Sequence, residues 1–139
     1  MSNVSVTSAQ APAAVGPYSQ AVRAGDFIFC SCQLGLDPAS GALVPGGAVE
    51  EARRVLINLR AVVEAAGASL ADVVRTTLYL SDLADFSAVN QLYAAFFPGT
   101  PPARTTLQAG LPKGARVGID AIVIVPSKPA VGSSNGPAS

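Results

Sequence analysis

The chain has 139 residues, the size of a single domain, and no stretch in its middle resembles a linker. Half of its residues are apolar and only 13% are charged, whereas charged side chains supply about a quarter of a typical soluble domain. This composition predicts that other subunits cover part of the surface in a homo-oligomer.

Nine basic residues balance nine acidic ones, and the lysines and arginines do not gather in one stretch. A nucleic-acid partner is therefore not expected, because neutralising a phosphate backbone needs clustered positive charge. No apolar run approaches the roughly 20 residues that cross a bilayer, and the first residues lack the charged start and apolar block of a signal peptide. We expect a cytoplasmic protein without a membrane partner.

The two ends of the chain are predicted to be flexible tails around one domain. Residues 1–10 are small and polar without periodicity, and residues 127–139 mix Pro, Ser, Gly and Ala. Residues 11–126 form the predicted domain. Within it, residues 21–24 and 27–32 are short β-prone runs around a Gly-Asp turn, an order typical of a hairpin.

Two amphipathic helices are predicted further along the chain. In residues 47–66 apolar side chains recur every three or four positions, and Gly67 suits the left-handed conformation that ends a helix. Residues 73–80 are rich in β-branched types and predict a strand. A second apolar stripe, over residues 83–97, predicts another helix that ends before Pro98.

Two further β-prone runs, residues 103–107 and 116–125, complete the order β-β-α-β-α-β-β. This order predicts an α+β fold, a mixed sheet with two helices packed on one face. The last run carries apolar residues at both alternating positions, so both faces of its sheet need cover. With the helices on one face, a neighbouring subunit is the simplest cover for the other.

The two cysteines, Cys30 and Cys32, are separated by one residue, and the chain has no histidine. In a regular strand both thiols would lie on the same side, roughly 6–7 Å apart and too far for a disulfide, so two reduced buried thiols are expected. Two thiols do not complete a zinc site unless carboxylates or another subunit join them. Without histidine, Ser-His-Asp and Cys-His nucleophiles are excluded, and neither a GxGxxG fingerprint nor a P-loop occurs.

Three residues are candidates for chemistry. Asp120 is alone in an apolar strand, where an ionised carboxylate costs on the order of several kcal/mol unless it finds a partner. That partner is a cation or a hydrogen-bond donor of a functional site or, alternatively, a local backbone amide or a lysine at the strand end. Arg104 has the planar fork that suits a carboxylate, although a surface arginine at a strand edge is the simpler explanation. Tyr18 follows a rigid proline, with ordinary loop packing as its alternative.

Seven motifs occur in one order along the chain: APAAVGPYSQA at 11–21, SCQ at 31–33, NLRAVVEAAG at 58–67, DLADF at 82–86, VN at 89–90, YAAFF at 93–97 and PAR at 102–104. From residue 11 to residue 125 the chain thereby resembles the RidA-like reactive intermediate deaminases, formerly called the YjgF type. The resemblance implies a chorismate-mutase-like fold and a homotrimer with three clefts between subunits. It also implies that neither a metal nor an organic cofactor takes part.

The reaction implied by the resemblance is the hydrolysis of 2-imino acids, such as 2-iminopropanoate and 2-iminobutanoate, to 2-keto acids and ammonia. Arg104 matches the arginine that holds the substrate carboxylate, and Asp120 falls where the family usually has the glutamate that positions the attacking water. Tyr18, Ser31 and Asn90 match residues of the substrate pocket.

Three positions depart from the family pattern. Cys32, whose backbone is expected beside the substrate, replaces a glycine, and Thr106, also counted with the substrate-binding residues, replaces a cysteine. Asp120 is one methylene shorter than glutamate. This last change is the most consequential, because displacing a catalytic group by about 1 Å can cost roughly a hundredfold in rate.

The proposed chemistry does not require histidine, because a 2-imino acid hydrolyses even in plain water and needs only positioning with modest acid-base help. Three alternatives remain open at this stage. The chain could be a carboxylate-binding regulatory trimer with little turnover, or an endoribonuclease or translation inhibitor, a role attached to some family members. It could also act on a more elaborate imine or enamine in a specialised pathway.

Overall fold

The structure, a computed structural model, describes residues 2–126. Its strands are β1 (Val4–Val6), β2 (Ala21–Ala24), β3 (Phe27–Leu34), β4 (Val73–Leu80), β5 (Ala103–Gln108) and β6 (Val117–Ile124), and its α-helices are α1 (Ala48–Ala65) and α2 (Phe86–Phe96). Short 3-10 turns at Leu70–Asp72, Leu83–Asp85 and Pro112–Gly114 precede β4, α2 and β6. The predicted order of five strands and two helices is therefore confirmed, and β1 is added to it.

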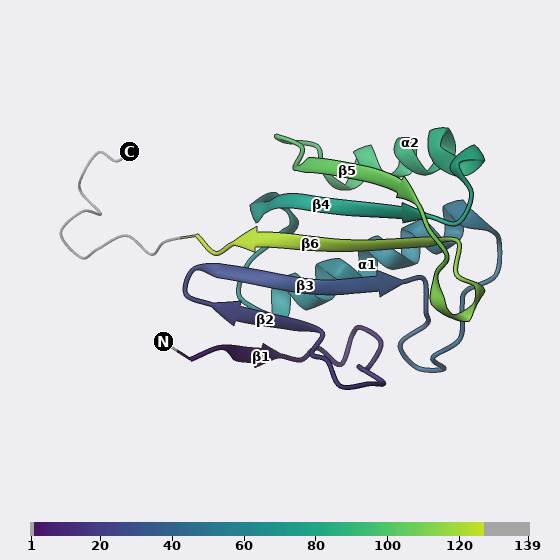
Figure 1. Cartoon of the computed structure of the whole chain (residues 1–139). Coiled ribbons are helices and arrows are strands. Elements are labelled where there is room, and N and C mark those ends of the chain that lie inside the picture. The colour runs from purple at the N-terminus through teal and green to yellow at the C-terminus, as the bar shows by residue number, and fades with distance from the viewer. Residues whose placement is uncertain (1, 127–139) are drawn as a thin grey trace.

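The strands form one sheet in the order β1-β2-β3-β6-β4-β5 (Figure 1). β4 and β5 are parallel and are joined through α2, whereas all other neighbouring strands are antiparallel. The predicted α+β class with a mixed sheet is confirmed. β6, the last strand in the chain, lies near the middle of the sheet, and β5 forms one edge.

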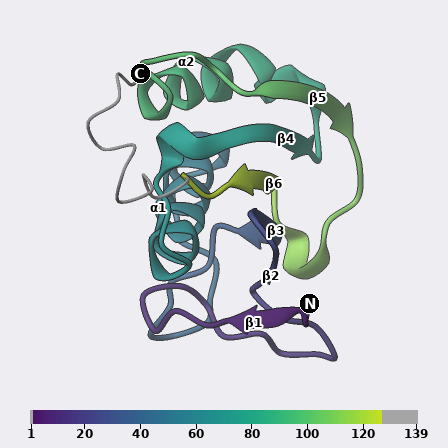
Figure 2. The same cartoon turned by 90° about the vertical axis from the view of Figure 1, so that its left-hand side faces the viewer.

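Both helices lie on one face of the sheet (Figure 2), as predicted. α1 packs across β3 and β6 and also contacts α2. A hydrogen bond of 2.6 Å between Tyr93 Oη and Thr76 Oγ1 fixes α2 to β4. The core between helices and sheet includes the fully buried side chains of Ile28, Val55, Leu56, Leu59, Leu78, Ile119 and Val123. No helix within residues 2–126 has the length and apolarity needed to cross a bilayer.

The N-terminal residues differ from the prediction of a loose tail over residues 1–10. Val4–Val6 pairs with β2, and Val6 is buried. The following loop is held by Gln20, whose Oε1 accepts from the Ser8 amide at 2.6 Å and whose Nε2 donates to the Ser8 carbonyl at 3.1 Å. Three alternating residues are too short a pattern to predict a strand, and a buried amide side chain makes the contact that orders them. The predicted tail at 127–139 lies outside the described residues.

The second face of the sheet is not covered by any described element. Phe27 and Phe29 are 44% and 47% exposed there, with their ring centroids 6.0 Å apart. They pair across the strands with Ile124 and Ile122. This open face, defined by the side chains of β3, β4 and β6 that point away from the helices, is the face for which the alternation in β6 predicted additional cover.

A β-bulge interrupts β3 next to the middle of β6. Cys30 pairs with Ala121 and Gln33 with Ile119, so Ser31 and Cys32 both stand opposite Asp120. The extra residue changes the side to which the chain points, and Cys30 is buried in the core whereas Cys32 is exposed on the open face. The expectation of two buried thiols on the same side was therefore wrong. The expectation of free thiols is confirmed.

Asn58 fixes the chain that leaves β3 to helix α1. Its Nδ2 donates to the carbonyl oxygens of Leu34 and Leu36 at 3.1 and 3.0 Å, and its Oδ1 accepts from Arg54 Nε at 2.9 Å. Between the two leucines, Gly35 passes so close to α1 that a Cβ atom would lie 2.9 Å from the Glu51 backbone. A fully buried amide thus sets the path of a segment that borders the cavity described below.

Replacing Asn58 by alanine is expected to lower the free energy of unfolding by about 2 kcal/mol or more, because two carbonyl groups lose their donors in a buried setting. Urea denaturation at fixed protein concentration measures this loss. The matched control is Arg54→Ala, which removes only the third bond of the same amide and is expected to cost less than about 1 kcal/mol. Equal losses in the two variants would contradict this role of Asn58.

Candidate active site

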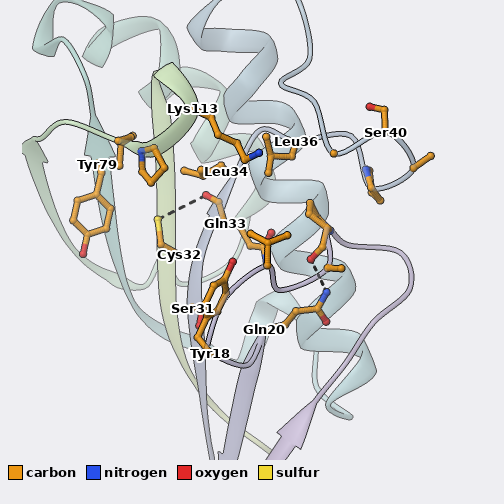
Figure 3. A pocket seen from close by; sticks show the side chains of 18 of the residues that line it. Tyr18, Gln20, Ser31, Cys32, Gln33, Leu34, Leu36, Ser40, Tyr79 and Lys113 are labelled. Carbon is orange, nitrogen blue, oxygen red and sulfur yellow. Dashed lines mark hydrogen bonds between the residues drawn. The ribbon is translucent and has the colours of Figure 1, made fainter.

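A cavity of about 910 Å³ opens at the end of the sheet where β3 is bulged. Its wall is formed by the loop before β2, the end of β3 with the loop that follows, and the turn before β6. The lining includes Pro12, Tyr18, Gln20, Ser31, Cys32, Leu34, Leu36, Tyr79, Leu111 and Lys113. Figure 3 shows Cys32, Ser31 and Tyr18 in sequence along one wall, so three predicted substrate-binding residues lie in one cavity.

Ser31 and Gln20 hold the loop that carries Tyr18. Ser31 Oγ donates to the Ser19 carbonyl at 2.7 Å, and the Ser31 amide donates to the Gln20 carbonyl at 2.9 Å. Gln20 Nε2 in turn donates to the Pro12 carbonyl at 2.7 Å. Tyr18, 52% exposed, is thereby placed at the wall of the cavity with its ring accessible to a ligand.

The sulfur of Cys32 on β3 packs against Gly118 on the neighbouring strand β6. This Sγ atom is 3.8 Å from the Gln33 carbonyl, and a Cβ atom added at position 118 would lie only 2.7 Å from the same sulfur. The thiol therefore occupies space that any larger residue at position 118 would need. This contact shows how the chain accommodates a side chain at position 32, where the resemblance led us to expect glycine.

Asp120 is half-buried on the open face of β6, beside the bulge. The phenol of Tyr79 donates to its Oδ2 at 2.8 Å, so the predicted partner of the carboxylate is a tyrosine hydroxyl. The pKa of Tyr79 is raised, first by this hydrogen bond and then by burial. Cys30 is buried, and the sulfur of Cys32 packs against Gly118 although the residue as a whole is exposed, so both thiols are shielded from water. This shielding, followed by the negative charge of Asp120, raises the pKa of both thiols to about 12. Both thiols are consequently neutral near pH 7 and are poor nucleophiles.

Arg104 lies on the edge strand β5, half-buried beneath α2. Its guanidinium carbon is 4.8 Å from the centre of the Tyr93 ring and 5.6 Å from that of Phe86. A guanidinium stacked in this way keeps its N–H groups in its own plane, where they can meet an anion. Burial raises the pKa of Tyr93, while its hydrogen bond to Thr76 and the charge of Arg104 act in the opposite direction.

Asn90 and Thr106 belong to the same region as Arg104. Thr106 follows Arg104 by two residues on β5 and so points to the same side of the strand, and it is half-buried. Asn90, also half-buried, follows Phe86 by one turn of α2. The structure therefore brings three predicted site residues, Arg104, Asn90 and Thr106, to the α2–β5 edge.

The predicted site residues form two groups on opposite faces of the sheet. The strand register pairs Arg104 with buried Thr76 beneath the helices, whereas Asp120 pairs with Thr77, the next residue of β4, on the open face. Tyr18, Ser31 and Cys32 line the cavity near Asp120, and Arg104 does not line it. One chain alone does not bring Arg104 and Asp120 into a common site.

Two residues of the candidate site were missed by the sequence analysis. Tyr79 sits in a run that was predicted only as a strand, although alternation within residues 73–80 could have placed its side chain on the face opposite to the buried leucines. Lys113, which lines the cavity, has an unusual left-handed backbone with φ of 61°, and no sequence feature indicated this conformation. Among residues 2–126, no three His, Cys, Asp or Glu residues gather in a way that could hold a metal ion.

The Endoribonuclease L-PSP family model matches residues 8–125 of the chain. The chain belongs to this family. Over 120 residues it is 52% identical to the 2-iminobutanoate/2-iminopropanoate deaminase of Capra hircus and 51% identical to that of Mus musculus, covering 86% of this chain and 88% and 89% of those proteins. The resemblance seen in the sequence motifs is confirmed.

Solved structures of L-PSP relatives share the fold. RidA from Psychrobacter sp. PAMC 21119 superposes with a TM-score of 0.84 at 41% identity, over 88% of this chain and 99% of that one. A structure from Thermotoga maritima described as a putative endoribonuclease superposes with a TM-score of 0.86 at 40% identity, over 89% and 98% of the two chains. The names of these relatives thus include both a deaminase and a putative endoribonuclease.

The raised pKa of Cys32 predicts slow thiol chemistry. At pH 8 a thiol with a pKa of about 12 is ionised in about one molecule in ten thousand, so alkylation by iodoacetamide should be slower than for a free cysteine by a factor of roughly ten or more. Asp120→Asn removes the second cause of the raised pKa and should accelerate the reaction. Mass spectrometry locates the modified residue, and Cys32→Ser is the control. Alkylation of Cys32 in the unchanged protein at the rate of a free cysteine would contradict the raised pKa of this thiol.

Proposed function

We propose that the protein hydrolyses 2-imino acids, such as 2-iminopropanoate and 2-iminobutanoate, to 2-keto acids and ammonia in clefts between the subunits of a cytoplasmic homotrimer. The names of the mammalian relatives at about half identity support the reaction. The placement of Arg104 and Asp120 on opposite faces of one sheet carries the proposal for shared clefts, because the two groups can act together only if they come from different chains.

The carboxylate of the substrate is assigned to Arg104. Charge-assisted hydrogen bonds from a guanidinium fork hold a carboxylate in one orientation, and the Tyr93 and Phe86 rings restrict the plane of this fork. Asn90 and Thr106 add polar groups at the same edge. This arrangement fixes the imine carbon at a constant distance from the sheet edge, which reduces the entropy that must be lost on reaching the transition state.

Water is assigned to Asp120 of a second chain. As a general base, the carboxylate accepts a proton from water while the water oxygen bonds to the imine carbon and a proton reaches the imine nitrogen. The protonated Asp120 then donates its proton to the amine nitrogen of the tetrahedral intermediate, and the hydroxyl proton passes to the carboxylate as the C–N bond breaks, which releases the keto acid and ammonia. Tyr18, Ser31 and the backbone at Cys32 shape the cavity wall on the side of the departing nitrogen.

The open face provides a surface on which chains can associate. Exposed Phe27, Phe29 and Ile124 form an apolar area at the end of the open face where β3 begins and β6 ends, and only 13% of all residues are charged. A face of this kind is stabilised by burial against a second copy. Packing open faces together brings the carboxylate of one chain to a subunit boundary, where the edge strand of a neighbour can reach it.

The ribonuclease alternative is supported only by the name of the family and by the names of some related structures. The chain has a formal net charge of zero and no histidine, which removes the usual phosphate attraction and the commonest acid-base group. An assay with labelled single-stranded RNA distinguishes the two functions. RNA cleavage that persists in Arg104→Ala, without acceleration of imine hydrolysis by the unchanged protein, would favour the ribonuclease.

Arg104→Ala is expected to lower kcat/KM by about a hundredfold or more, because the substrate loses a charge-assisted bidentate clamp. The assay couples a serine or threonine dehydratase to the protein and measures the competition between keto-acid release and trapping of the imine by semicarbazide. The matched control is Arg60→Ala, which also removes an arginine stacked on an α2 ring, that of Phe96 at 5.6 Å, but should retain turnover. Equal activity losses in both variants would indicate a role in folding instead.

Mixing two impaired variants tests whether the site is shared. Coexpression of Arg104→Ala and Asp120→Asn chains with different tags yields mixed oligomers, in which about one cleft in four combines an intact arginine with an intact carboxylate when chains assort at random. Averaged over all clefts, turnover should therefore recover to about a quarter of the wild-type rate. No recovery in oligomers shown to contain both tags would contradict a site built from two chains.

A further inference from the structure

Tyr79 on β4 reaches diagonally across the open face to Asp120 on β6. In the strand register Tyr79 stands opposite Gly118, and Asp120 stands opposite Thr77. Diagonal neighbours of this kind lie about 7–8 Å apart, a distance that an aromatic side chain can span. Because Gly118 has no side chain, nothing from the directly opposing position separates the phenol from the carboxylate, and the Tyr79 Oη to Asp120 Oδ2 distance is 2.8 Å.

We propose that Tyr79 is a positioning residue for Asp120, in which the phenol holds Oδ2 so that Oδ1 is directed at the attacking water. This inference rests on the role proposed above for Asp120. Tyr79 lines the cavity beside Cys32 (Figure 3), whereas Asp120 is not among the lining residues. The phenol therefore connects the carboxylate to the wall of the candidate site.

Within residues 2–126 of one chain, Asp120 has no ion pair that could fix the carboxylate in place of Tyr79. The ion pairs among residues 2–126 are Arg53 with Glu50 and Arg116 with Glu51, and neither involves Asp120. The other titratable groups on which the charge of Asp120 acts are the thiols of Cys30 and Cys32 on β3, which are neutral near pH 7. The hydrogen bond from the phenol is thus the interaction of the described chain that sets the orientation of the carboxylate.

The phenol of Tyr79 is suited to donate a fixed hydrogen bond and not to transfer a proton during the reaction. The pKa of Tyr79 is raised, chiefly by the hydrogen bond to Asp120, so the group keeps its proton throughout the neutral range. An aspartate has two torsions between its backbone and its carboxylate, and without the bond the oxygens can turn away from the water. A loss of orientation at a general base lowers the rate of the chemical step more than it weakens substrate binding.

Tyr79→Phe keeps the ring and removes the donor, which makes it the direct test. In the coupled imine assay, kcat is expected to fall by about tenfold while KM stays within about twofold. In an Asp120→Asn background, the same Tyr79→Phe change is expected to have no further effect on kcat, because the carboxylate that it positions is already absent. Thermal unfolding of each variant shows whether the fold is retained.

Tyr93→Phe is the matched control, since it removes a buried phenol hydrogen bond of 2.6 Å on the opposite face of the sheet. Its effect should multiply with that of Asp120→Asn, as expected for sites without a shared partner. If Tyr79→Phe lowers kcat equally in both backgrounds, the residue has only a structural role and the inference fails. The inference about Tyr79 also fails if Asp120→Asn is slow but Tyr79→Phe has full activity. If Asp120→Asn itself has full activity, the proposed role of the carboxylate is refuted instead.

Discussion

Side-chain alternation along β5 and β6 places Arg104 beneath α2 and Asp120 on the open face of the same sheet. This separation cannot be relieved by a rotamer change, because a sheet of backbone hydrogen bonds lies between the two groups. The proposed anion clamp and the proposed acid-base group of one polypeptide therefore belong to different surfaces. An apolar open face and a low content of charged residues support the proposed association of chains, because burial against a second copy would stabilise such a surface.

The β3 bulge has a second effect on the chemistry. By placing Ser31 and Cys32 opposite a single residue, it directs Ser31 to the loop of Tyr18 and leaves Cys32 over Gly118. A cysteine at the wall of a candidate site suggests a nucleophile, but here the shielding of the sulfur and the negative charge of Asp120 keep the thiol protonated. What remains for catalysis is a small set of oriented oxygen and nitrogen groups, which suits a reaction that already proceeds slowly in water.

The sequence was sufficient for most of the architecture, because the apolar spacing of residues 47–66 and the β-branched run at 73–80 each match one type of element. It could not predict β1, whose three residues depend on a distant Gln20 side chain, or the bulge, which appears only once β3 is paired with β6. Arg104, Asp120 and Tyr18 were selected from the sequence as candidate site residues. Their division between two faces was not foreseen, because it depends on the register between strands far apart in the chain.

The contact between Cys32 and Gly118 also bears on how this chain can change over time. The sulfur and a hypothetical methyl group at position 118 would compete for the same few cubic ångströms, so the two sites do not vary independently. A lineage can therefore acquire a larger residue at position 118 only after position 32 has changed to a smaller one. Libraries designed to widen the substrate range should therefore randomise both codons together, since single-site screens would discard combinations that fold well.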